Sequence, residues 1–190
     1  MKFSLSIVAI LSLVGAITAL PSPVNPPEEQ KDPPLAALTL ANAPPHNEKF
    51  QCGGNTYTGY DIYVAARYGL SLYLAKQTRG REYSTYKGQA EQSLTIPGNK
   101  YPESFYSDDS KGVKLHFPPD CPADHSRYSF PLKKGGVPYN GGPNNRNQGD
   151  ERVVYYYEDG EIDGDTKHPK AYYCGIMTHK GAAVGGFHQC

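Results

Sequence analysis

Residues 58–77, TGYDIYVAARYGLSLYLAKQ, carry the strongest helical pattern in this 190-residue chain. Thr58 is a good N-cap, and Asp61 stands three residues later, where its carboxylate can reach back to the backbone N–H of the cap. Apolar residues then recur at helical spacing from Ile62 to Leu74. The sequence therefore predicts one amphipathic helix that buries one face.

Beyond this helix the apolar residues recur with a period of two, which is typical of half-buried strands. Strands are predicted at 113–117, 127–132, 152–157 and 171–178, with an edge or a bulge near Pro131. The polar segment 78–100 is predicted to be a loop. One helix and a set of antiparallel strands indicate an α+β domain in which the helix packs on the sheet.

The N-terminal residues have the composition of a secretory signal peptide followed by a leader. Lys2 precedes a short apolar run, and Ile17-Thr18-Ala19 supplies a cleavage site. The next thirty or so residues are rich in proline, and such a composition cannot bury enough apolar surface to offset the entropy of ordering it. We therefore expect a signal peptide at 1–19, a disordered leader or propeptide at 20–49 and a secreted, extracellular domain at 50–190.

All four cysteines lie in the expected domain: Cys52, Cys121, Cys174 and Cys190. An even number in a secreted domain indicates two disulfides, although four cysteines allow three pairings. A bond between Cys52 and Cys190 would join the two ends of the domain. No two cysteines have the close spacing of zinc ligands, so neither a metal nor a cofactor is expected.

The formal net charge is zero, which excludes a general electrostatic attraction to nucleic acids or to anionic membranes. Any binding of a polyanion must therefore come from a local cluster of cations. Past the signal peptide, no apolar stretch is long enough to span a bilayer. We expect a monomer that has no membrane partner.

Three polar residues stand where the predicted strands begin or end. Arg152 opens one strand, His179 ends another, and Glu103 precedes the first. On one sheet face these groups would suit phosphoryl transfer in RNA: the carboxylate takes the 2′-hydroxyl proton, the imidazolium protonates the leaving 5′-oxygen, and the guanidinium holds the phosphate. Taken alone the pattern is weak, because such arginines and histidines more often have surface or structural roles.

Five short segments occur in a fixed order: 52–57 (CGGNTY), 101–102 (YP), 130–132 (FPL), 152–155 (RVVY) and 174–190 (CGIMTHKGAAVGGFHQC). In this order the chain resembles the fungal guanyl-specific ribonucleases and the related ribotoxins, most specifically in the last segment. The resemblance implies a helix packed on a twisted antiparallel sheet, with RNA in the concave face. It also implies the pairings Cys52–Cys190 and Cys121–Cys174.

By position, His179 resembles the general acid of that family and Arg152 its phosphate-binding arginine. Tyr101 corresponds to a tyrosine that contacts the phosphate, and Phe187 to the aromatic residue that lines the site. The pattern then departs from the family twice. Glu103 stands where the family has histidine, and Ser129 stands where it has the catalytic glutamate.

These departures allow two readings. In the favoured one, catalysis is lost or much reduced, since losing an acid–base partner typically costs about 10²–10⁴-fold in rate. The protein is then an RNA-binding relative of the ribonucleases, similar to the ribonuclease-like effectors that fungal plant pathogens secrete into hosts. In the alternative, Glu103 is a relocated base, and the protein is an active endoribonuclease that forms a 2′,3′-cyclic phosphate. A third reading is a secreted scaffold that has no RNA role.

Recognition of the base is assigned to the segment after Glu103. Guanine presents two donors on its Watson–Crick edge, so Asp108 and Asp109 are candidate acceptors and Tyr106 a candidate stacking residue. Two loop aspartates are, however, often simply solvated. The expected partner is single-stranded RNA, with a host protein or ribosomal RNA as further targets. Cleavage at one ribosomal site is less favoured, because segment 78–100 is only mildly basic.

Overall fold

The computed structural model describes residues 37–80, 83–87, 93–97, 100–141, 148–157 and 169–190. The predicted signal peptide and residues 20–36 of the predicted leader lie outside these ranges. Within the described residues, one helix packs on a mostly antiparallel sheet, and two disulfides are formed. This architecture confirms the predicted α+β class.

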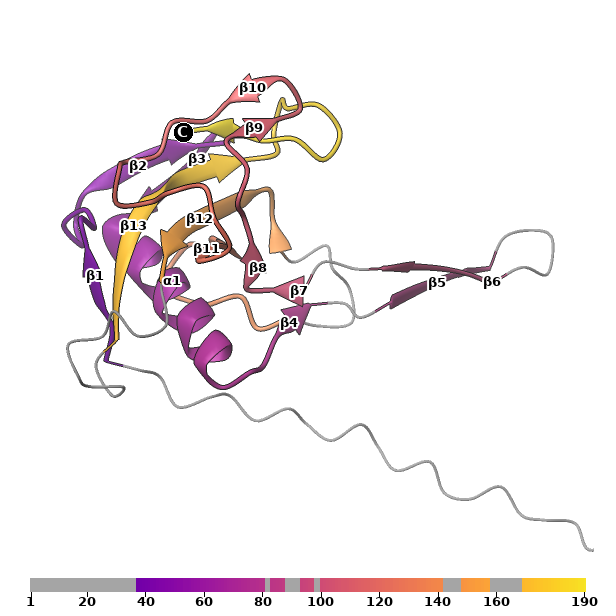
Figure 1. Ribbon diagram of the computed structural model, residues 1–190, viewed down its shortest axis with the longest axis horizontal. Helices are drawn as coiled ribbons and strands as arrows, with labels where there is room; N and C mark the ends of the chain where they lie inside the picture. Colours follow the sequence, from indigo (N-terminus) through magenta and orange to yellow (C-terminus); the bar gives the residue numbers. More distant parts are fainter. Residues whose placement is uncertain (1–36, 81–82, 88–92, 98–99, 142–147, 158–168) are drawn as a thin grey trace, which may run out of the picture. The chain divides into compact units, whose positions relative to one another are not determined.

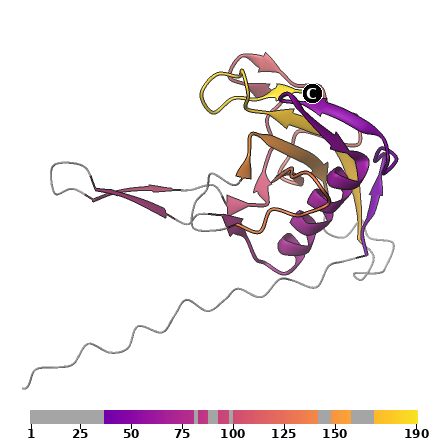
Figure 2. The same ribbon diagram turned by 180° about the vertical axis from the view of Figure 1, so that it is seen from behind.

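The elements follow one another as β1 Thr39–Ala41, β2 Lys49–Cys52, β3 Asn55–Thr58, α1 Gly59–Leu74, β4 Arg79–Gly80, β5 Tyr83–Lys87, β6 Ser93–Pro97, β7 Lys100–Tyr101, β8 Glu103–Ser104, β9 Asp109–Ser110, β10 Val113–Lys114, β11 Arg127–Pro131, β12 Glu151–Tyr156, β13 Lys170–Thr178 and β14 His188–Gln189. The main sheet has the order β1-β13-β12-β11-β8, and β14 also pairs with β13. In both views α1 lies alongside β11 and β12 (Figures 1 and 2).

The helix begins where the sequence predicts. Thr58 is the N-cap: its hydroxyl accepts from Asp61 N at 3.2 Å, and its own N–H donates to Asp61 Oδ2 at 2.8 Å. The helix ends at Leu74, three residues before the predicted end, because Lys76 has a positive φ of 54° that is incompatible with a further helical turn.

The long strands are predicted well, whereas the short ones are not. β11, β12 and β13 confirm the strands expected at 127–132, 152–157 and 171–178. β8 pairs with β11 only as far as Ser129, so Pro131 lies beyond that ladder, as a residue lacking an N–H requires. The strand expected at 113–117 shrinks to two residues. The loop expected at 78–100 is wrong in part, because β5 and β6 pair as a hairpin there.

The two faces of the main sheet bury two different cores. Phe130, Val153 and Ile176 form one registered row that packs with α1. Gly69 permits this close approach, because a Cβ on it would lie 2.9 Å from the Phe130 ring. On the other face, Val154 and Met177 pack in a smaller core with segment 105–121. Each fully buried aliphatic side chain contributes about 1.5–3 kcal/mol.

The two disulfides confirm the pairing that the family resemblance implies. Cys52 bonds to Cys190 across a sequence separation of 138, and Cys121 bonds to Cys174 across 53. Closing a loop as long as the first contributes about 4–5 kcal/mol in the chain-entropy treatment of disulfides. None of the helices in the described ranges has the length and apolar content needed to cross a bilayer.

The end of the predicted leader belongs to the folded domain, which corrects the expectation of disorder over 20–49. Thr39–Ala41 forms β1, which adds to the sheet in parallel with β13. Leu38 and Leu40 are buried in the main core, and Leu38 O accepts from the Tyr63 hydroxyl at 3.3 Å. These two leucines supply buried apolar surface. The average composition of the proline-rich segment does not reveal them.

We predict that Leu40→Ala lowers the free energy of unfolding by about 2–3 kcal/mol, since it removes a buried side chain from the sheet edge. Urea denaturation of the oxidised chain measures this change. The exposed neighbour in the same strand provides the control, because Thr39→Ala should change stability by less than about 0.5 kcal/mol. Equal stabilities of the two variants would contradict a structural role for β1.

Candidate functional site

The register of the sheet brings the predicted site residues to the face opposite the helix. Glu103 pairs with Ser129, and Ser129 pairs with Val154, so these residues form one row across β8, β11 and β12. Arg152 stands two residues before Val154 and points to the same side. His179 directly follows β13, and its N–H donates to Asp150 O at 3.0 Å. Four residues from distant parts of the sequence therefore converge.

Arg152 lies at the centre of this group and is fully buried. Its Nε–H donates to the Tyr101 hydroxyl at 3.1 Å, and Nη1 donates to Gly149 O at 2.9 Å and to Glu151 O at 2.8 Å. The guanidinium carbon lies 5.0 Å from the centre of the Tyr101 ring. Among the described residues, Nη2 has no hydrogen-bond partner. A buried guanidinium N–H without an acceptor costs free energy, so this atom is suited to an incoming anion.

Tyr101 is predicted to contact phosphate, and the structure gives its hydroxyl a different neighbour. The side chain is almost completely buried, and its ring meets the rings of Phe130 and Tyr139 edge-on. Its hydroxyl accepts from Arg152 Nε. In this structure Tyr101 therefore orients the guanidinium, and Arg152 presents the positive charge.

His179 is held in one orientation by two contacts. Its ring stacks on the ring of Phe187, with 3.8 Å between centroids. Nδ1 lies 2.6 Å from Gly186 O, and because a carbonyl only accepts, Nδ1 carries the proton. Nε2 is thus the nitrogen left for a ligand. Partial burial lowers the pKa of His179, as does the charge of Arg152, while the bond to Gly186 and the charge of Asp150 act to raise it.

Glu103 has the opposite shift. Although the residue is exposed at the surface, its carboxyl group is partly withdrawn from water, which raises its pKa. The positive charge of Arg152 lowers that pKa in part. The paired residue Ser129 is buried and small, so it does not crowd the longer side chain beside it. The site thus holds a carboxyl group and an imidazole whose pKa values have shifted toward each other.

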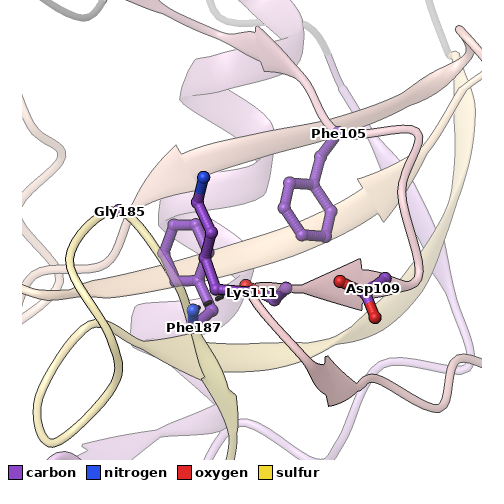
Figure 3. A pocket seen from close by; sticks show the side chains of 6 residues that line it. Phe105, Asp109, Lys111, Gly185 and Phe187 are labelled. Carbon is purple, nitrogen blue, oxygen red and sulfur yellow. Dashed lines mark hydrogen bonds between the residues drawn. The ribbon is translucent and has the colours of Figure 1, made fainter.

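A pocket of about 280 Å³ lies beside Phe187, the residue whose ring stacks on His179 (Figure 3). Its lining consists of Phe105, Asp109, Ser110, Lys111, Gly185 and Phe187. The rings of Phe105 and Phe187 stand at 88° to each other, with 5.7 Å between centroids. Phe187 N donates to Ser110 Oγ at 2.6 Å, which joins the two sides of the pocket. Since Phe187 also stacks on His179, it links the pocket to the charged group, although His179 does not itself line the pocket.

The predicted base-recognition residues divide in the structure. Asp109 lines the pocket, and its Oδ1 accepts from Gly112 N at 3.1 Å. Tyr106 does not line it, because its ring packs against His125 with 5.0 Å between centroids. Asp108 does not line it either, because its carboxylate accepts from Arg127 Nη2 at 2.8 Å. The aromatic wall is Phe105, which sequence analysis missed.

A signal for Phe105 was present in the sequence. It stands two residues after Glu103, and alternate residues of an extended segment point to the same side. Ser110, Lys111 and Gly185 had no comparable signal, because they meet only when two distant turns approach each other.

Glu151 is a further buried carboxylate that sequence analysis missed. It accepts from the Tyr57 hydroxyl at 2.9 Å and from Asn55 Nδ2 at 3.2 Å, and lies 3.5 Å from Thr178 Oγ1. Burial, and then the hydrogen bond to Glu151, raise the pKa of Tyr57 well above its ordinary value. Gly53 has a φ of +58°, and a Cβ on it would collide with the Glu151 carboxylate. This cluster fixes hairpin β2–β3 against the strand ends that bear Arg152 and His179.

The described part of the chain contains no group of three or more His, Cys, Asp or Glu side chains arranged to hold a metal ion. The polar groups of the site are instead a guanidinium, an imidazole, a carboxyl group and a phenol. Compared with known protein families, the chain matches no family model.

Proposed function

We propose that this protein is a secreted, ribonuclease-like protein that binds single-stranded RNA on the sheet face opposite α1. The phosphate would lie at Arg152 and His179, and a base would enter the adjoining pocket. The observation that carries the proposal is the unpartnered Nη2 of buried Arg152 beside an oriented imidazole. The disulfide pairing and the helix-on-sheet architecture also agree with the resemblance to guanyl-specific ribonucleases.

The charges of the site favour a phosphate over a neutral ligand. Arg152 is permanently cationic, and its charge reaches both Glu103 and His179 strongly enough to influence their pKa values. Its side chain is covered in the unliganded structure, so a phosphate reaches Nη2 only after a neighbouring side chain shifts. Exposed Glu103 is a residue that can move in this way without disturbing a core.

The pocket suits a planar base. Phe105 and Phe187 offer aromatic surface, and stacking of a base on such a ring contributes about 1–3 kcal/mol. Asp109 Oδ1 accepts from Gly112 N, so Oδ2 is the acceptor that we propose for the adjacent donors on the Watson–Crick edge of guanine. We therefore propose guanine as the preferred base, with Asp109 keeping the acceptor role predicted for it and Asp108, and Phe105 taking the stacking role predicted for Tyr106.

RNA cleavage is a second candidate function, and the pairing of Glu103 with Ser129 favours it. A serine at its usual pKa cannot accept a proton, but the neighbouring strand places a carboxyl group directly beside it. Glu103 would take the proton from the 2′-hydroxyl, and the resulting O2′ would attack the phosphorus. His179 Nε2–H would donate its proton to the departing 5′-oxygen. The products are a 2′,3′-cyclic phosphate and a free 5′-hydroxyl.

Two disulfides are compatible with an oxidising, extracellular compartment. We propose secretion on this basis together with the N-terminal composition. If the protein does not cleave RNA, we propose that it is an effector that acts inside a host cell by binding RNA. Ribosomal RNA and a host protein remain proposed targets of such an effector.

We predict that Arg152→Lys weakens binding of a single-stranded, guanine-containing RNA oligonucleotide about tenfold or more, because the fork of donors is lost. Fluorescence anisotropy at several salt concentrations measures this, and because lysine keeps the positive charge, the slope of log K against log salt should stay close to that of the wild type. Lys49→Ala, an exposed change on β2, is the control and should bind as the wild type does. Equal binding by Arg152→Lys would contradict the proposed phosphate position.

If the site is catalytic, we predict that Glu103→Gln and His179→Ala each lower the cleavage rate of that RNA about 10²–10⁴-fold. Ser129→Ala is the matched control, since it alters the paired position without touching a proposed acid or base. Gel analysis of the products, including the cyclic phosphate end, measures the rates. If the wild type binds RNA without cleaving it, the protein is a binding protein and not a ribonuclease. Unchanged cleavage by Glu103→Gln would exclude Glu103 as the base.

The shifted pKa values predict a narrow bell-shaped pH dependence of kcat/KM for cleavage, which reports the acid and base of the free protein. Glu103 must be ionised, so activity is lost as the pH falls through its pKa, which is raised above 4.5. His179 must be protonated, so activity is lost as the pH rises through its pKa, which is lowered below 6.5. Asp150→Asn should move the alkaline limb to still lower pH, because the Asp150 charge raises the pKa of His179. An alkaline limb above pH 6.5 would contradict this assignment.

A further inference from the structure

We propose that Arg127 is the positioning residue of the base pocket, and that it acts through the backbone of Phe105 and the carboxylate of Asp108. This inference rests on the proposed binding of a base in the pocket. Arg127 stands on β11, two residues before Ser129, and is completely buried. It does not line the pocket, so any effect on a ligand must pass through the residues that it holds.

Arg127 holds Phe105 through both the backbone N–H and the backbone carbonyl of Phe105. The Phe105 N–H donates to Arg127 O at 2.7 Å, and Arg127 Nε–H donates to Phe105 O at 2.7 Å. The guanidinium carbon also lies 5.6 Å from the centre of the Phe105 ring. One residue thus sets both the backbone and the ring of the pocket wall.

The same guanidinium fixes the segment that bears Asp109. Arg127 Nη2 donates to Asp108 Oδ1 at 2.8 Å, while Asp108 O accepts from Leu115 N at 2.8 Å. Asp108 is therefore held through its side chain and its main chain, and the next residue, Asp109, lines the pocket. Phe105 and Asp109, the two pocket residues proposed to contact the base, bracket the segment that Arg127 binds.

The other side of the guanidinium is anchored to a rigid part of the fold. Nη1 donates to the carbonyl of Cys121 at 3.0 Å, and Cys121 is bonded to Cys174 on β13. The guanidinium carbon lies 4.3 Å from the centre of the Phe117 ring. Arg127 therefore ties the pocket segment to the main sheet through a covalently restrained residue.

The carboxylate of Asp108 is the charge partner of this buried cation. Lys114 approaches the other carboxylate oxygen at 4.0 Å, but its side chain is largely exposed, so that contact contributes little. Removing the Asp108 carboxylate leaves a buried charge without its partner, which is strongly unfavourable. The segment 105–109 must then rearrange to solvate the guanidinium, and the spacing of Phe105 from Phe187 changes with it.

The test compares Asp108→Ala with Asp124→Ala in the oxidised full chain. Asp124 is the matched control, because it is a half-buried carboxylate with two side-chain hydrogen bonds, from Ser126 N and the Tyr156 hydroxyl, and does not line the pocket. Its main-chain carbonyl accepts from Arg127 N at 3.4 Å, and Asp124→Ala leaves that carbonyl in place. Calorimetry with two separate probes, guanosine and inorganic phosphate, reports the pocket and the Arg152 region independently. We expect Asp108→Ala to bind guanosine at least tenfold more weakly, with phosphate affinity unchanged, and Asp124→Ala to match the wild type with both probes.

Hydrogen exchange gives a readout that needs no ligand. In Asp108→Ala the amides of Phe105 and Leu115 should exchange faster, while those of β12 and β13 stay protected. Arg127→Lys, which keeps the charge but loses the fork, should show the same pattern, and the double variant should be less than additive. If Arg127→Lys does not fold, Asp108→Ala alone decides the outcome.

Unchanged guanosine binding by Asp108→Ala would overturn the inference. Equal losses of guanosine and phosphate affinity would also overturn it, because the effect would then be general. Failure of the wild type to bind guanosine would instead overturn the proposed function of the pocket. The exchange rates would still show whether Arg127 and Asp108 hold the segment, and unchanged rates would reject that role as well.

Discussion

The hydrogen bonds to the buried carboxylate of Glu151 hold together the part of the fold that bears the proposed site. This carboxylate gathers a phenol, an amide and a hydroxyl from hairpin β2–β3 and from β13. A buried charge needs such partners, so the strands that supply them must meet at one place. Arg152, the next residue along β12, turns to the opposite face and is fully buried as well. Glu151 and Arg152, which are adjacent in β12, thus hold polar partners on the two opposite faces of the sheet next to the proposed site.

The covering of both sheet faces explains where a ligand can bind. α1 covers one face, and segment 105–121 covers much of the other. In the described part of this second face, exposed Glu103 lies on β8 and half-buried His179 directly follows β13. Phe105 and Phe187 pack against the smaller core and also line the pocket. The proposed site therefore lies at the edge of the smaller core.

The features that could be predicted from the sequence are those that depend on interactions between residues close together in the chain. The capping box of Thr58 and Asp61 needs only neighbouring residues, and the period of two in β11, β12 and β13 reports local burial. Long-range register is not encoded locally. Phe105 lines the pocket in place of Tyr106 because of where β8 pairs with β11, and Asp108 is occupied because a buried arginine lies 19 residues away. Leu40 joins the core because β13 offers it an edge.

The parallel pairing of β1 also bears on how the chain resists proteolysis. Proteases cut extended, unpaired segments, and residues held in a sheet with buried side chains are poor substrates. Once the domain has folded, Thr39–Ala41 is therefore protected from endoproteases, because it pairs with β13 and buries Leu40. A cut within this strand has to wait until the sheet edge opens, so the fold itself keeps β1 attached to the domain.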